Sequence, residues 1–210
     1  MVFFTLKEIF DALLMSFVVG FIFSGVFTPV RLHRTPDDII NEYIENPKVK
    51  KSKLKSVSFS NLFKGSWFRD ILFASMVVAP AIVLHELGHK IVALGFGMQA
   101  TFHAAYEWLG VGIILKIIGF PFIFFVPAYV SIFGGNNLSF GLTALAGPLI
   151  NLILYLISLI IMKFGKLNNK QRYFFALTRR INIILFFFNM LPIPGFDGFQ
   201  VYTNLYRAFF

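Results

Sequence analysis

Long apolar runs alternate with short polar segments along most of the chain. Three runs, Ala12 to Val30, Ile71 to Gly97 and Phe140 to Phe164, are each long enough for a helix to cross the hydrocarbon core of a bilayer, which takes about 20 residues. A fourth is expected to begin near Ile181, because Arg179-Arg180 are typical of a membrane boundary. The pattern predicts a helical protein that crosses a membrane several times.

The segment between the second and third of these runs is less regular. Residues Met98 to Gly110 are polar and aromatic and suit a strand or an interfacial segment. Val111 to Val126 is apolar but contains Lys116, Gly119 and Pro121, so it is either a full span or a re-entrant segment. The β-branched stretch "AYVSIF", residues 128–133, precedes a "GGNN" turn. We therefore expect an all-α polytopic protein with about 4–5 transmembrane helices and a short re-entrant or β-hairpin segment.

Composition supports lipid as the solvent and narrows the possible partners. Of the 210 residues, 57% are hydrophobic, 14% are charged and 29 are phenylalanine, whereas a soluble domain is about a quarter charged. The net charge of +9 comes mostly from residues between apolar runs, including "KVKKSKLK" at 48–55. Such positions favour contact with anionic lipid over nucleic acid. The absence of cysteine excludes thiolate metal sites.

The second apolar run contains the motif His85-Glu86-Leu87-Gly88-His89. On a helix, His85 and His89 lie one above the other, at the spacing that lets two imidazoles bind one zinc ion. Glu86 is offset, so it can approach a water molecule that the metal activates and accept its proton. The alternative is a buried histidine–glutamate hydrogen-bond network, but ionisable groups inside membrane spans are rare unless they are functional.

A catalytic zinc site needs a third protein ligand. The candidates are His103 and Glu107, just past the motif, and Asp197 in "NMLPIPGFDGF". Asp197 is favoured because Pro192, Pro194 and two glycines break the helix there, and broken backbone at membrane depth lines polar cavities. A carboxylate beside two neutral histidines also lowers the net charge of a buried zinc site.

A third motif is "AGPLIN", where Gly147 permits close helix packing and Asn151 places an amide inside a span. Asn151 could hydrogen-bond a substrate or a developing oxyanion, or it could form an interhelical hydrogen bond. The residues alone do not distinguish these roles.

Together the three motifs resemble the site-2 protease family of intramembrane zinc metalloproteases. The family pattern is HExxH, then a GPxxN-type element, then N-x-x-P-x-P-x-x-D-G, and it matches the chain in that order at 85–89, 147–151 and 189–198. Phe196 and Phe199 depart from the leucine and glycine that are frequent in the family. The match spans about 71–198.

The resemblance implies the roles of the site residues. His85, His89 and Asp197 would bind one Zn²⁺ per chain, Glu86 would be the general base and acid, and Asn151 and Asn189 would contact the substrate or transition state. The enzyme would hydrolyse peptide bonds in or near transmembrane segments of other membrane proteins. A strand of the segment between Met98 and Phe133 would pair with the unwound substrate.

The same resemblance suggests how the chain is divided and where it resides. An N-terminal transmembrane helix and a polar basic loop would occupy 1–70, the protease core 71–198, and an interfacial tail 199–210. The protein would be a multi-pass component of a prokaryotic cell membrane, with lipid and membrane-protein substrates as partners and no nucleic acid. Orientation stays open, because the family arrangement places the basic loop outside and the positive-inside rule places it inside. A catalytically silent protein that binds membrane helices is the alternative function.

Overall fold

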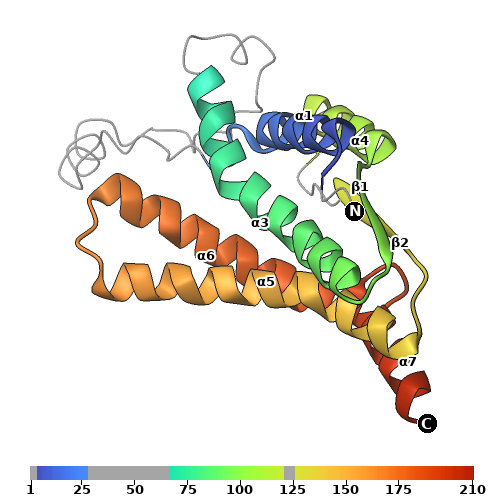
Figure 1. Cartoon of the computed structure of the whole chain (residues 1–210). Coiled ribbons are helices and arrows are strands. Elements are labelled where there is room, and N and C mark those ends of the chain that lie inside the picture. The colour runs from blue at the N-terminus through green and yellow to red at the C-terminus, as the bar shows by residue number, and fades with distance from the viewer. Residues whose placement is uncertain (1–3, 28–66, 121–125) are drawn as a thin grey trace, which may run out of the picture.

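Two long apolar helices cross at the centre of the molecule (Figure 1). The structure is a computed structural model that describes residues 4–27, 67–120 and 126–210. Within these ranges, helices α3 (Trp67–Gly95) and α5 (Asn137–Phe164) are the two that are long and apolar enough to cross a membrane. They match the second and third apolar runs. The larger predicted number of spans remains a prediction.

Helix α1 (Leu6–Phe23) packs against α3 and buries Met15, Val19 and Ile22 completely. It begins six residues before the predicted span, because Thr5 and Glu8 form a capping box that starts the helix. Its first two turns contain three charged residues, more than a membrane-crossing helix usually carries. The basic stretch at 48–55 of the expected loop lies outside the described residues.

Strands β1 (Gln99–Ala104) and β2 (Ala128–Phe133) pair antiparallel, with Gln99 opposite Phe133 and Ala104 opposite Ala128. Helix α4 (Tyr106–Ile117) lies between them in the chain, so the pair is not a simple hairpin. With 12 residues, α4 is too short to cross a bilayer. In the described part of this region, residues 111–120 and 126, no helix is long enough to be the full span that was one of the two predicted alternatives.

Helix α6 (Asn169–Asn189) runs back along α5, and α7 (Asp197–Phe209) packs against the other end of α5 (Figure 1). The expectation that a membrane span begins near Ile181 remains a prediction, and the helix itself begins before Arg179-Arg180. Asn168 and Gln171 form a capping box that starts α6 ten residues earlier. The domain boundary predicted at 198 falls inside α7.

The crossing of α3 and α5 depends on Gly88, which is buried between the two motif histidines. A Cβ at this position would lie 2.8 Å from Ile150 Cγ1 and 3.0 Å from the carbonyl oxygen of Ala146. Both atoms belong to α5, so a side chain at residue 88 would push the helices apart. The glycine inside HExxH is therefore also a packing residue.

Substituting Gly88 tests this contact. Gly88→Ala should destabilise the metal-free protein by roughly 1–3 kcal/mol, the usual effect of overpacking a close-packed site. Thermal unfolding in detergent with a chelator present measures the change. Gly95→Ala is the matched control, since nothing lies within 4 Å of a Cβ there. Equal stability of the two variants would contradict the packing role.

Candidate metal centre

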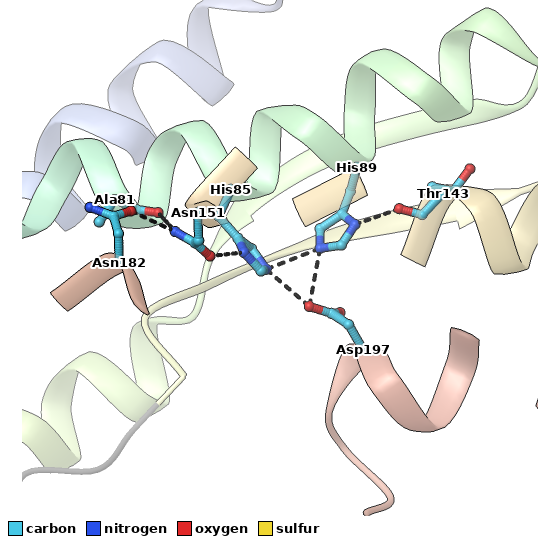
Figure 2. Close-up of polar contacts among 7 residues, drawn as sticks. All are labelled: Ala81, His85, His89, Thr143, Asn151, Asn182 and Asp197. Atoms are coloured by element: carbon cyan, nitrogen blue, oxygen red, sulfur yellow. Dashed lines mark hydrogen bonds and ion pairs between the residues drawn. The ribbon is translucent and has the colours of Figure 1, made fainter. Parts of the chain in front are cut away.

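His85 and His89 occupy successive turns of α3 and place their Nε2 atoms 3.1 Å apart (Figure 2). Both side chains are buried, with 6% of each residue exposed. The spacing predicted from the sequence is therefore realised on the face of α3 that packs against α5. Whether these Nε2 atoms can bind a metal depends on the hydrogen bond that each ring makes through Nδ1.

Asn151 of α5 fixes the ring of His85. The Nδ2 group of Asn151 donates hydrogen bonds of 2.9 Å to the carbonyl oxygen of Ala81 and to Oδ1 of Asn182. Its own Oδ1 then lies 2.6 Å from His85 Nδ1 and accepts a hydrogen bond from it. His85 Nε2 is thereby left with a lone pair that points away from Asn151 (Figure 2).

The ring of His89 is oriented in the same way by backbone. Its Nδ1 donates to the carbonyl oxygen of Thr143 on α5 at 2.7 Å. Carbonyl oxygens only accept, so this bond again places the proton on Nδ1 and the lone pair on Nε2. Both motif histidines are thus in the form that binds metal through Nε2.

Asp197 comes from the opposite side, at the first residue of α7. The helix break between α6 and α7 turns at Gly195, which has a positive φ of 98°. Gly198 has no such dihedral but permits close packing, because a Cβ there would lie 2.4 Å from the carbonyl carbon of Met190. These two glycines bring the carboxylate back to the histidines of α3.

The three groups form a site that fits a metal cation. Asp197 Oδ2 lies 3.0 Å from His85 Nε2 and 3.4 Å from His89 Nε2. Three electron-rich atoms facing one another repel unless a cation or a proton lies between them. A tetrahedral zinc ion with bonds of about 2.0–2.1 Å separates its ligands by about 3.3 Å. The observed separations match that value.

Gly147 of α5 keeps space open beside this group. A Cβ at Gly147 would lie 2.3 Å from His89 Nε2 and 2.7 Å from His85 Nε2. Any other residue would place its side chain against the ligand atoms. The "GPLIN" motif thus serves the site twice, through Gly147 at the ligands and Asn151 behind His85.

The group opens onto a cleft of about 840 Å³. Glu86 and Asn189 line this cleft together with the three candidate ligands, and most of its remaining walls are apolar. Glu86 is half-buried and has no hydrogen-bond partner among the described residues. Glu86 thus lines the same space as the metal group, as expected for a proton acceptor.

The other residues singled out from the sequence lie elsewhere. Asn151 is completely buried and does not line the cleft. Its contacts support orientation of His85, and the predicted contact with substrate has no support from them. Glu107 is exposed on α4, and His103 stacks on Tyr129 across the two strands. Neither joins the metal group, which leaves Asp197 as its third member.

Thr143 and Asn182 were not predicted. Thr143 acts through its backbone carbonyl, which side-chain identity cannot reveal. Asn182 did have a signal, since it is a polar residue in an apolar stretch of α6, and it is completely buried. Its role depends on the packing of α6 against α5, which brings its amide to Asn151.

Two curated proteins resemble the chain. "Putative zinc metalloprotease MJ0611" of Methanocaldococcus jannaschii is 36% identical over 132 residues, which cover 62% of this chain and 69% of that protein. The chain belongs to this zinc metalloprotease family. "Putative zinc metalloprotease YwhC" of Bacillus subtilis is 28% identical over 142 residues, covering 60% of this chain and 65% of that protein.

No family model matches the chain, and no solved structure matches it significantly. For this zinc metalloprotease, the prediction of one Zn²⁺ per chain as cofactor is confirmed. Relatives carry zinc in their names, and His85, His89 and Asp197 form a group that can hold one ion.

Removing Asp197 should weaken metal binding strongly. Asp197→Ala leaves two histidines, too few for a stable catalytic zinc site. The expected result is about one zinc per chain in the wild type and a large loss in the variant, measured by elemental analysis of detergent-purified protein. Gln200→Ala, one turn further along α7, should retain zinc. Full zinc content in Asp197→Ala would remove Asp197 from the site.

Asn151→Ala should lower zinc affinity roughly 10–100-fold, the usual effect of losing a group that orients a metal-binding histidine. Competition with a zinc chelator measures the affinity. Asn137→Ala replaces an exposed asparagine on the same helix and should have no effect. An unchanged affinity in Asn151→Ala would show that His85 needs no orienting partner.

Proposed function

We propose that the chain is an intramembrane zinc endopeptidase of the site-2 type. It would hydrolyse peptide bonds in or near transmembrane segments of other membrane proteins, from a multi-pass position in a prokaryotic cell membrane. The observation that carries this proposal is the joint lining of one apolar cleft by the metal group, Glu86 and strand β2. A metal site, a proton acceptor and a strand edge are the parts that peptide hydrolysis needs.

The membrane location is supported by the helix that carries the histidines. His85 and His89 lie in α3, one of the two described helices that can cross a bilayer. Cleft walls built from Phe23, Trp108, Phe140 and Phe188 suit an apolar peptide better than a polar one. Both relatives come from prokaryotes.

Strand β2 offers a way to hold the peptide. Ala105 N donates to Pro127 O at 3.0 Å, so the register places the backbone groups of residues 127, 129, 131 and 133 toward β1. The N–H and C=O groups of Ala128, Val130 and Ile132 then point to the other edge. No hydrogen bond to these groups is found among the described residues, and all three residues line the cleft.

An extended peptide that adds to β2 would pass along the wall that the metal group shares. Main-chain hydrogen bonds would hold it independently of its sequence, as in other cases of strand addition. A transmembrane helix would have to unwind to bind in this way, because only extended backbone presents its N–H and C=O groups sideways. Asn189, also in the cleft, is placed to contact such a peptide.

The residues of the chain divide the chemistry among them. His85, His89 and Asp197 would hold the metal. When bound, Zn²⁺ supplies a Lewis acid that polarises the scissile carbonyl and lowers the pKa of a water molecule. Glu86 would accept the proton of the attacking water and deliver it to the leaving amine nitrogen, so it acts first as base and then as acid. Asn151 would keep His85 in the required tautomer.

Glu86→Gln tests the reaction directly. The variant should retain zinc and lose cleavage of a membrane-segment substrate by at least about a hundredfold, since general acid–base groups contribute roughly 10²–10⁴-fold. Glu107→Gln is the matched control, because Glu107 is exposed outside the cleft. The measurement is product formation in detergent or in proteoliposomes, with zinc content recorded for each protein.

The same experiment distinguishes an active protease from a catalytically silent protein that binds membrane helices. A wild type that holds zinc and captures substrate but never cleaves it would favour that alternative. Equal cleavage by the wild type and by Glu86→Gln would contradict the assignment of Glu86 as the proton acceptor.

A further inference from the structure

The N-terminal turns of helix α1 contact the edge of β1 that faces away from β2. The register that directs odd-numbered residues of β1 toward β2 directs the amides of Phe102 and Ala104 the other way. In an uncovered sheet these N–H groups would form a second open edge. Here they face α1.

Two carboxylates of α1 accept these amides. Glu8 Oε1 accepts a hydrogen bond of 2.8 Å from Phe102 N, and Asp11 Oδ2 accepts a longer one of 3.4 Å from Ala104 N. Asp11 Oδ1 accepts a third from the hydroxyl of Tyr106, which starts α4. Residues three apart on a helix lie on one face. Glu8 and Asp11 can therefore each reach one of the two outward-facing amides of β1.

The same carboxylates bind the helix that carries the metal ligands. Glu8 Oε1 also pairs with the ammonium group of Lys90, the residue that follows His89. Glu8, Asp11 and Lys90 are at most 2% exposed. Buried charges are costly unless they are paired and hydrogen-bonded. This cluster therefore fixes three elements against one another: α1, β1 and the metal-binding end of α3.

We propose that Glu8 and Asp11 are positioning residues that serve as a side-chain edge for β1. They close the outer edge of the sheet and leave β2 as the edge available to a peptide. Through the ion pair between Glu8 and Lys90, they also fix the position of β2 relative to the metal group. The proposal rests on the proposed function for its effect on cleavage. It makes α1 part of the substrate-binding apparatus although α1 contributes no metal ligand.

Loss of the α1 carboxylates is expected to affect substrate binding more than metal binding. The hydrogen bonds of α1 reach the strands, whereas the histidines are oriented from α5. Loss of the α1 carboxylates should therefore move β2 while leaving the ligand atoms in place. The expected signature is a raised KM with a nearly unchanged kcat and zinc content.

A matched pair of triple variants separates the edge from the ion pair. Glu8→Gln, Asp11→Asn and Lys90→Met together remove the charges but keep side-chain oxygens that can accept the two amides. Glu8→Met, Asp11→Leu and Lys90→Met together remove the oxygens as well. Both sets avoid an unpaired buried charge, which is what makes broken ion pairs unfold proteins.

The first readout is hydrogen exchange of the Phe102 and Ala104 amides in detergent-purified protein. Exchange should be at least roughly tenfold faster in the apolar set than in the amide set, because only the amide set keeps acceptors. The second readout is cleavage, where the apolar set should raise KM roughly tenfold to a hundredfold. Ser16→Ala, which removes a hydroxyl of α1 that hydrogen-bonds the carbonyl oxygen of Ala12 in the same helix, should change neither.

Equal exchange and equal KM in the two triple variants would overturn the proposal. If the apolar set does not fold, Asp11→Leu alone tests the Ala104 contact while leaving the Glu8–Lys90 pair intact, and unchanged exchange at Ala104 then overturns it. A wild type without cleavage would contradict the proposed function instead. The exchange comparison still tests the edge in that case.

Discussion

The repulsion among three electron-rich atoms is the constraint on which the site depends. Two histidine nitrogens and one carboxylate oxygen lie 3.0–3.4 Å apart, and only a cation or a proton makes that arrangement favourable. Close packing of α3 on α5 at Gly88 and Gly147 permits it. The hydrogen bonds of Asn151 and of the Thr143 carbonyl select the tautomers that maintain it. The metal centre is thus a property of a helix crossing rather than of the HExxH motif alone.

Around that centre the structure separates two tasks. Helices α3 and α7 carry the candidate metal ligands and α5 orients the histidines, whereas α1 holds the strands that line the cleft. Lys90 joins the two parts, since it extends from α3 directly after His89 to the carboxylate of Glu8. A single turn of α3 therefore carries a candidate metal ligand on one side and the anchor of the sheet on the other.

The sequence allowed the long apolar helices, the metal group and the cleft-facing glutamate to be predicted, because each depends on local spacing or on a strong motif. Asp197 was favoured over the other candidates because Pro192 and Gly195 marked a break where a polar residue could face inward. The start of α6 was not predicted, and neither was α4, the helix that lies between β1 and β2 in the chain. The capping box at Asn168 that starts α6 was not recognised in the sequence, and α4 contains no residue pattern that distinguishes a short helix from a longer span. Contacts through backbone carbonyls, such as that of Thr143, have no signature in side-chain order.

The placement of Asp197 on a separate helix has a consequence for biogenesis. His85 and His89 are made early in synthesis, whereas Asp197 is made only after α5 and α6, the helices that pack against each other between them in the chain. The order of synthesis therefore delays completion of the metal group until the bundle exists. A nascent or misassembled chain would have a histidine pair without its carboxylate. Such a chain would lack the third ligand that a catalytic zinc site needs.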